Sequence, residues 1–306
     1  MANLENLKIF TGATHSALAL DVCAYIDIPL GKATVTKFAN DNTFVQYQEN
    51  IRQQDVFIMQ PFGYPVNDSI MELLIMIDAA KRASAGRITA VVPYYAYGRT
   101  DKKDQPRVPI TARLLADLIE VAGAHRILTL DMHAGQIQGF FNIPVDELTA
   151  LPLLTNYFRK KELTNAVVVA VDIGISKRAR DMANNLEIPL AIIEKRRMGN
   201  NDSTEVLNVI GDVTGKKAIT FDDETDTGGS LTSAAQAALD AGATEVYSCS
   251  THGVFTKPSV ERINNSNIHE MVVTDTLPSA TRTDSPKVKV ISVASLLGEA
   301  ICRIHE

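Results

Sequence analysis

Residues 122–133 read AGAHRILTLDMH, and residues 241–252 read AGATEVYSCSTH. Each stretch begins with Ala-Gly-Ala, continues as an apolar strand and ends on a histidine, His133 or His252. Each also follows an amphipathic helical stretch, and before that helix comes a strand that ends in a polar loop. The matching order of strand, loop, helix, strand and histidine predicts a duplicated α/β unit.

Short apolar runs alternate with amphipathic helical stretches along most of the chain, and the helices include 69–85 and 109–122. Ser69 and Glu72 predict a capping box at the start of the first helix, and Gly86 predicts its end. The strands are nearly continuous in apolar residues, which indicates mainly parallel sheets covered by helices. The expected strands are 55–60, 87–93, 125–131, 166–171, 189–193, 217–222, 244–250 and 287–293.

The chain has 306 residues, and at about 100–200 residues per domain this length favours two domains. We place them at 1–147 and 148–306 and expect both to be α/β domains of similar fold, with helices flanking a mainly parallel sheet. A net charge of −6 argues against a general nucleic-acid or membrane-surface binder, and no apolar run is long enough to span a membrane. The three cysteines lack the spacing of a metal or redox site, which suits a reducing compartment. The first segment lacks a secretory pattern, so we expect a cytoplasmic protein.

Residues 221–230, FDDETDTGGS, place four acids beside what looks like an anion cradle. The stretch lies where a strand gives way to a helix, which is where ligands bind in open α/β sheets. Gly228 and Gly229 allow backbone N–H groups to approach a phosphate closely, and Thr227 and Ser230 add hydroxyl donors. The alternative is an ordinary capped turn with solvated acids.

A sugar phosphate would reconcile the acids with the cradle. Like charges packed together cost free energy unless they find partners. The cradle would take the phosphate, while the carboxylates accept hydrogen bonds from sugar hydroxyls or hold a hydrated Mg²⁺. The candidate ligand residues are Asp222, Asp223, Asp226, Thr227, Gly228, Gly229 and Ser230.

The stretch 221–230 resembles the ribose-phosphate loop of the phosphoribosyltransferase fold, and 131–146, DMHAGQIQGFFNIPVD, resembles the ribose-phosphate pyrophosphokinases, or PRPP synthetases. In that family the residue corresponding to His133 is a magnesium ligand. Residues 170–180, AVDIGISKRAR, resemble the family's pyrophosphate loop, which implies Asp172 as a second metal ligand and Mg²⁺ as the cofactor.

This pyrophosphate loop departs from the family at two positions. Val171 stands where the family has Pro, and Ile175 stands where it has a second Gly. Because Ile does not readily take a positive φ, we expect the loop backbone to differ locally.

Residues 93–107, PYYAYGRTDKKDQPR, resemble the family's ATP-binding loop, although a solvated charged loop would read similarly. Residues 194–205, EKRRMGNNDSTE, resemble its catalytic flexible loop, whose cations stabilise the charge of the transferring group. The residues implied by these two loops are Arg99 and Thr100 for ATP, and Lys195 and Arg197 for catalysis.

Residues 38–42, FANDN, resemble the hairpin with which the family reads adenine from a neighbouring subunit. Phe38 and Asn40 fit that pattern, whereas Asn42 stands where Glu is expected. Glu can only accept from the adenine amino group, while Asn can both donate and accept. Nucleotide preference is therefore the property that this difference at residue 42 most affects.

The resemblance runs from about residue 7 to residue 304 and implies a ribose-phosphate diphosphokinase that converts ATP and ribose 5-phosphate into PRPP and AMP. A non-catalytic regulatory homologue is one alternative, which the retained candidate catalytic groups oppose. An ordinary phosphoribosyltransferase is another, but it does not explain a duplicated domain. The family further implies a homo-oligomer, a hexamer or its dimer unit, with phosphate and ADP as effectors and Arg52 and Arg82 as candidate contacts.

Overall fold

The computed structural model describes residues 4–161, 163–197, 204–281 and 283–306. The α/β class expected from the sequence is confirmed. Among the described residues, no helix is both long and apolar enough to cross a membrane. The chain forms two compact units, an N-unit of Met1–Thr149, Thr276–Pro278 and Ser292–Glu306, and a C-unit of Ala150–Asp275 and Ser279–Ile291.

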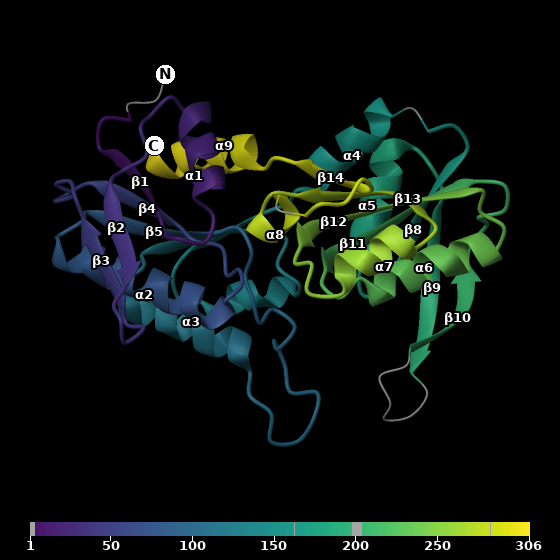
Figure 1. Ribbon diagram of the computed structural model, residues 1–306, viewed down its shortest axis with the longest axis horizontal. Helices are drawn as coiled ribbons and strands as arrows, with labels where there is room; N and C mark the ends of the chain where they lie inside the picture. Colours follow the sequence, from purple (N-terminus) through teal and green to yellow (C-terminus); the bar gives the residue numbers. More distant parts are fainter. Residues whose placement is uncertain (1–3, 162, 198–203, 282) are drawn as a thin grey trace. The chain divides into compact units, whose positions relative to one another are not determined.

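The N-unit is built on a parallel sheet with the strand order β1-β4-β5-β6-β7. Its central strands are buried runs of apolar residues, so helices must cover both faces. Helices α1 and α9 lie on one face, α2 and α3 on the other, and β2 and β3 form a separate antiparallel hairpin (Figure 1). The elements are β1 (Leu7–Thr11), α1 (Ser16–Tyr25), β2 (Ala33–Lys37), β3 (Thr43–Tyr47), β4 (Asp55–Met59), α2 (Val66–Arg82), β5 (Arg87–Val92), α3 (Thr111–Ala122), β6 (Arg126–Leu130), the 3₁₀ helix η1 (Gly135–Phe140), β7 (Val145–Leu148) and α9 (Ala294–His305).

The C-unit is built on a sheet with the order β10-β9-β8-β11-β12-β13-β14, in which β9 and β10 pair antiparallel and the other pairs are parallel. Helices α4 and α5 lie on one face, and α6 and α7 on the other (Figure 1). Helix α8 (Pro278–Thr281) crosses from one unit into the other. The remaining elements are α4 (Leu151–Lys160), β8 (Ala166–Ala170), α5 (Ser176–Leu186), β9 (Leu190–Arg197), β10 (Thr204–Ile210), β11 (Lys217–Thr225), α6 (Gly229–Asp240), β12 (Glu245–Gly253), α7 (Ser259–Asn265), β13 (Ile268–Thr274) and β14 (Val288–Ile291).

The repeat read from the sequence has the same structure in both units, as β5–α3–β6 and as β11–α6–β12. Each helix is followed by a glycine of positive φ, +120° at Gly123 and +98° at Gly242. The N–H of the next alanine, Ala124 or Ala243, bonds to the carbonyl five residues back, at 3.3 and 3.0 Å. Glycine takes this conformation without steric cost, so Ala-Gly-Ala ends the helix and starts the next strand in register.

Helix α2 begins at Val66 and ends at Arg82, earlier at both ends than the sequence predicts. The predicted capping box is wrong, because its two side chains lie inside the helix and serve other partners. The Ser69 hydroxyl donates to the Val66 carbonyl at 2.7 Å, and the Glu72 carboxylate accepts the N–H of Ala13 at 2.5 Å.

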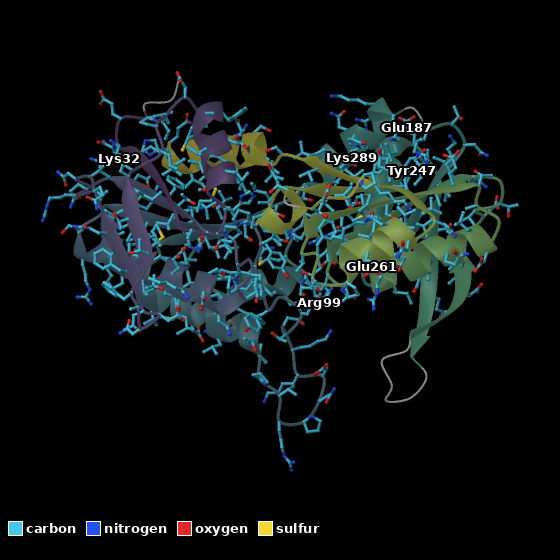
Figure 2. All side chains as sticks on the ribbon, viewed as in Figure 1. Lys32, Arg99, Glu187, Tyr247, Glu261 and Lys289 are labelled. Carbon is cyan, nitrogen blue, oxygen red and sulfur yellow. The ribbon has the colours of Figure 1, made fainter. Side chains whose placement is uncertain are left out.

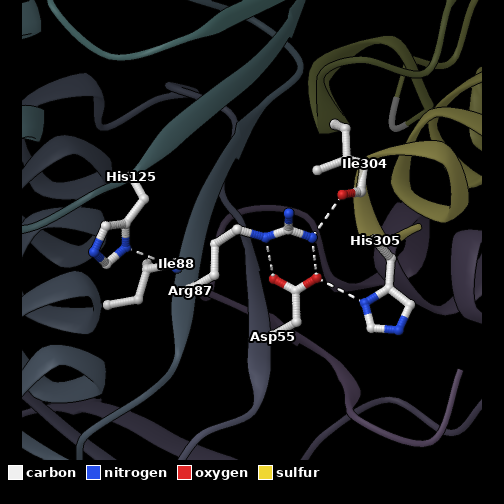
Figure 3. A network of polar contacts seen from close by, with 6 residues as sticks. All are labelled: Asp55, Arg87, Ile88, His125, Ile304 and His305. Carbon is white, nitrogen blue, oxygen red and sulfur yellow. Dashed lines mark hydrogen bonds and ion pairs between the residues drawn. The ribbon is translucent and has the colours of Figure 1, made fainter.

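Residues 292–306 belong to the N-unit, whereas the sequence places them in the second domain. Helix α9 packs against α1, and polar contacts tie its end to the sheet (Figure 3). Arg87 donates from Nε to Asp55 at 2.8 Å and from Nη2 to the Ile304 carbonyl at 2.6 Å, and His305 Nδ1 lies 2.7 Å from the Asp55 carboxylate. These charge-assisted bonds join residues far apart in the chain. A local sequence pattern therefore does not show that the chain end belongs to the N-unit.

Candidate active site

The candidate acids of the C-unit come together where β8 ends beside the longer strand β11. β8 and β11 are parallel, with Ala170 opposite Phe221, so Asp172 and Asp222 reach the same edge of the sheet. The Asp222 carboxylate accepts the N–H of Asp223 at 2.9 Å. Burial raises the pKa of Asp222 well above its usual value, and the charges of Asp223 and Asp172 raise it further. Carboxylates crowded in this way gain free energy from a cation or from hydroxyl donors.

Strand β11 continues to Thr225, whereas the sequence predicts its end at 222. Glu224 and Thr225 pair with β12, which keeps this part of the acidic stretch in the sheet. The turn is therefore reduced to residues 226–228, followed at once by α6. The acids before Asp226 are fixed by strand pairing rather than by a loop.

The short turn has the geometry of an anion cradle. Gly228 is buried with φ of +76°, and α6 begins at the next residue, so the unpaired N–H groups of the helix start lie here. A Cβ on Gly228 would also lie 3.2 Å from the Ser259 hydroxyl. The side chains of Thr227 and Ser230 are exposed, as hydroxyl donors to a ligand would be.

Two side chains outside the predicted site residues contact this turn. The Thr256 hydroxyl donates to the Asp226 carboxylate at 2.6 Å, and Arg262 Nη1 donates to the Thr227 carbonyl at 3.2 Å. Their partners lie 30 and 35 residues away in the chain. No local motif marks such contacts, and only the folded sheet brings α7 beside the turn.

The loop after β8 is unstrained. Ile175 has φ of −87°, lies in the core of the C-unit and precedes α5, and the Asp172 carboxylate accepts its N–H at 3.1 Å. Ile175 thus takes an ordinary right-handed conformation and avoids the positive φ that isoleucine does not readily adopt. The expected local difference from the family's loop stays a prediction.

The candidate catalytic cations lie on the β9–β10 hairpin. The backbones of Lys195 and Arg197 belong to β9, where they pair with Val206 and Thr204, although the sequence places them in a loop. The Lys195 and Arg197 side chains, and residues 198–203 entirely, lie outside the described residues. Their predicted role therefore stays a prediction.

In the N-unit, the predicted ATP loop meets the predicted metal ligand. The His133 side chain is exposed just after β6, and a Cβ on Gly98 would lie 3.2 Å from the His133 Cβ. Gln136 donates to Asp101, which joins η1 to the same loop. The structure thus brings the loop after β5 and the end of β6 together.

Arg99, labelled in Figure 2, lies next to Thr100 on a tight turn of that loop. The Thr100 N–H and hydroxyl both donate to the Tyr97 carbonyl, at 2.9 and 2.7 Å, and Tyr97 has φ of +61°. The Arg99 side chain is exposed. A fixed turn that holds an arginine outward suits contact with a phosphate or a base face.

The β2–β3 hairpin presents an aromatic side chain beside two amides. Phe38 is 57% exposed, with its ring centroid 5.5 Å from that of Phe44. The Phe38 N–H donates to the Asn42 carbonyl at 2.9 Å, and the Asn42 N–H donates to the Asn40 side chain at 3.3 Å. The backbone of Asn42 therefore holds the turn, while its own side chain is exposed.

Within the described ranges, no group of three or more His, Cys, Asp and Glu side chains has the arrangement of a metal site. Mg²⁺ commonly takes only one or two protein ligands and fills its shell with water and substrate phosphate oxygens. His133 is in the N-unit and Asp172 in the C-unit, and each remains a candidate ligand.

Residues 7–123 match the N-terminal domain of ribose phosphate pyrophosphokinase, and residues 198–306 match the phosphoribosyl synthetase-associated domain. A ribose-phosphate pyrophosphokinase of Clostridium acetobutylicum is 51% identical over 304 residues, covering 99% of this chain and 95% of that protein. Another, from Caldanaerobacter subterraneus, is 52% identical over 308 residues, covering 100% and 97%. The crystal structure of phosphoribosylpyrophosphate synthetase from Mycobacterium smegmatis matches with a TM-score of 0.92 and 41% identity, covering 98% of this chain and 99% of that one.

Proposed function

The chain belongs to the ribose-phosphate pyrophosphokinase family, and we propose that its two units divide the reaction, the N-unit binding nucleotide and the C-unit binding ribose 5-phosphate. The reaction transfers the β,γ-diphosphate of ATP to the C1 hydroxyl of ribose 5-phosphate and yields PRPP and AMP. One observation carries the division of roles: crowded carboxylates stand beside an anion cradle in the C-unit, while the corresponding N-unit loop carries cations.

Ribose 5-phosphate would bind along the β11–α6 turn. Its phosphate would accept from the N–H groups of Gly228, Gly229 and Ser230 and from the Thr227 and Ser230 hydroxyls. The ribose hydroxyls would donate to Asp222 and Asp223, while Asp226 closes the cradle. The acids and the cradle then serve opposite ends of one ligand.

ATP would bind through Arg99 and Thr100 of the loop after β5, with the base against Phe38, Asn40 and Asn42 of a hairpin. Because that hairpin would come from a neighbouring copy, we propose a homo-oligomer, a hexamer or its dimer unit. Phosphate and ADP are the proposed effectors, and the cytoplasm is the proposed site of action.

In the transfer, the C1 hydroxyl oxygen would attack the β-phosphorus and lose its proton to solvent water. The bond from that phosphorus to the oxygen shared with the α-phosphate breaks, and AMP leaves with the electron pair. Catalysis of this kind depends on positioning and on neutralising charge, a role we assign to Lys195 and Arg197.

The donor set is compatible with a magnesium cofactor. His133 and Asp172 would each be a protein ligand of Mg²⁺, and the crowding that raises the pKa of Asp222 makes a nearby cation favourable. His is an unusual partner for an ion that prefers oxygen, and it rests on the family resemblance. Mg²⁺ when bound supplies charge neutralisation on the diphosphate oxygens.

The experiment is ³¹P NMR of the purified protein with ribose 5-phosphate, MgATP and inorganic phosphate, repeated with excess EDTA. We expect PRPP and AMP to appear together, no ADP, and no turnover in EDTA. ADP with a phosphorylated sugar would show single phosphoryl transfer and overturn the proposal. Saturable ribose 5-phosphate binding without turnover would favour the non-catalytic homologue.

A further inference from the structure

The ribose-phosphate turn is braced from one side by α7 and by the segment that leads into it. The N–H of Phe255 donates to the Thr225 carbonyl at 3.0 Å, and Arg262 Nη1 donates to the Thr227 carbonyl at 3.2 Å. The peptide groups after Thr225 and after Thr227 are therefore both held by their oxygens from the α7 side. None of the residues assigned to the reaction above supplies these bonds.

Peptide geometry links this brace to the ligand. A trans peptide is planar, and its C=O and N–H bonds point in opposite directions. When the Thr227 carbonyl points at Arg262, the N–H of Gly228 in the same plane must point away from α7. The bond from Arg262 therefore sets the direction of one donor of the cradle.

We propose that Arg262 is a positioning residue that orients the Thr227–Gly228 peptide for the 5-phosphate of ribose 5-phosphate. The inference rests on the proposed function of this turn as the ribose 5-phosphate site. The guanidinium also brings positive charge to the cradle, because Nη1 would lie 3.5 Å from a Cβ on Gly229. It thereby offsets part of the repulsion between the phosphate and the nearby carboxylates.

The length and shape of the Arg262 side chain suit the bond that it makes to the Thr227 carbonyl. The residue lines an open groove of about 760 Å³ together with Gly229, Thr232 and Asn265. A shorter side chain would leave the Thr227 carbonyl to water, which does not fix the peptide plane. Arginine's planar fork holds such a bond with less loss of freedom than the flexible ammonium of lysine.

The test compares Arg262→Gln and Arg262→Lys with a matched control, Arg159→Gln. Arg159 is also an exposed arginine of the C-unit that donates to a backbone carbonyl, that of Asn185 at 2.6 Å, and it is not assigned to the turn. In Arg262→Gln, the loss of one charge-assisted bond should raise the KM for ribose 5-phosphate about three- to tenfold. The KM for ATP and kcat should stay within about twofold, Arg262→Lys should recover part of the loss, and Arg159→Gln should resemble the wild type.

Calorimetric titration with ribose 5-phosphate, without nucleotide, separates this inference from the proposed reaction. Weaker binding by Arg262→Gln at an unchanged melting temperature supports the inference, even if the wild type forms no PRPP. Wild-type affinity in Arg262→Gln overturns it and leaves the proposed reaction standing. Equal losses for ribose 5-phosphate and ATP with a lowered melting temperature also overturn it, because they indicate a general structural role.

Discussion

The β5–α3 and β11–α6 connections join corresponding elements of the two sheets but differ in length and in charge. The first spans residues 93–110 and carries cations such as Arg99 and Lys103, and it extends well beyond its sheet (Figure 1). The second consists of residues 226–228 and follows a run of acids. The strands and helices on either side are alike, so the connections decide what each unit can bind.

The difference also separates two ways of binding an anion. The short turn offers backbone N–H groups at a helix start, and its conformation requires a glycine. The long loop offers side-chain charge on a turn fixed by Tyr97 and Thr100. The short turn should therefore be sensitive to changes of backbone conformation, and the long loop to changes of side-chain charge.

The largest effect should come from Gly228→Ala. Alanine at φ of +76° costs about 1–2 kcal/mol and displaces the turn, and misplaced binding groups can lower rates by about 100-fold. We expect kcat/KM for ribose 5-phosphate to fall by about that factor in steady-state assays. Gly215→Ala is the control, since Gly215 has φ of +70° with no atom within 4 Å of its Cβ position. Similar losses in both variants would mean that the effect is general destabilisation.

Asp222→Asn should weaken ribose 5-phosphate use about tenfold or more and yet stabilise the metal-free protein. The pKa of Asp222 is raised in the fold, so between the usual carboxyl pKa and the raised value the folded protein keeps a proton that the unfolded chain has lost. The free energy of unfolding therefore falls as pH rises through that window, and a neutral Asn avoids this loss. Asn also keeps the oxygen that accepts from Asp223.

Melting temperatures in EDTA at several pH values test this. Asp222→Asn should melt about 2–4 °C above the wild type at neutral pH, and the gap should close as pH falls. Asp181→Asn removes an exposed charge from α5 and should change little. A pH-independent gap, or a lower melting temperature for Asp222→Asn, would show that the fold does not disfavour the ionised form of Asp222.

Arg99→Ala should raise the KM for ATP about tenfold, as expected for the loss of one charge-assisted phosphate contact, with the KM for ribose 5-phosphate unchanged. Lys103→Ala removes an exposed charge from the same loop and serves as the control. Initial rates with each substrate varied in turn would distinguish them. A larger effect of Arg99→Ala on ribose 5-phosphate than on ATP would reverse the roles that we assign to the two connections.

The smallest effect should come from Asn42→Glu. The backbone of residue 42 holds the hairpin, so the turn should survive the change. Glu accepts from the adenine amino group but cannot donate to the carbonyl of guanine, so the preference for ATP over GTP should rise by about two- to fivefold. Competing the two nucleotides in one assay measures the ratio, and an unchanged ratio would remove residue 42 from base selection.

The sequence predicts best what depends on short-range pattern. The strand expected at 166–171 is β8 at Ala166–Ala170, and the helix expected at 109–122 is α3 at Thr111–Ala122. Ala-Gly-Ala predicts both helix ends because a positive φ leaves a local mark in the sequence. The cradle likewise carries its own signal in adjacent glycines and hydroxyls.

Features that depend on distant partners were not predictable in this way. β11 extends past residue 222 because Thr225 pairs with β12, and Lys195 lies in a strand because it pairs with β10. The return of α9 to the N-unit depends on contacts between Asp55, Arg87 and the chain end. Arg262 was missed for the same reason, since its partner lies 35 residues away.

The measurement that tests the central claim most directly is amide TROSY NMR of the deuterated protein, titrated separately with ribose 5-phosphate, inorganic phosphate and ribose. We expect the Gly228 and Gly229 signals to move with ribose 5-phosphate and with phosphate but not with ribose, while signals from residues 93–110 stay in place. Ribose 5-phosphate shifts confined to residues 93–110, with the Gly228 and Gly229 signals unmoved, would contradict it.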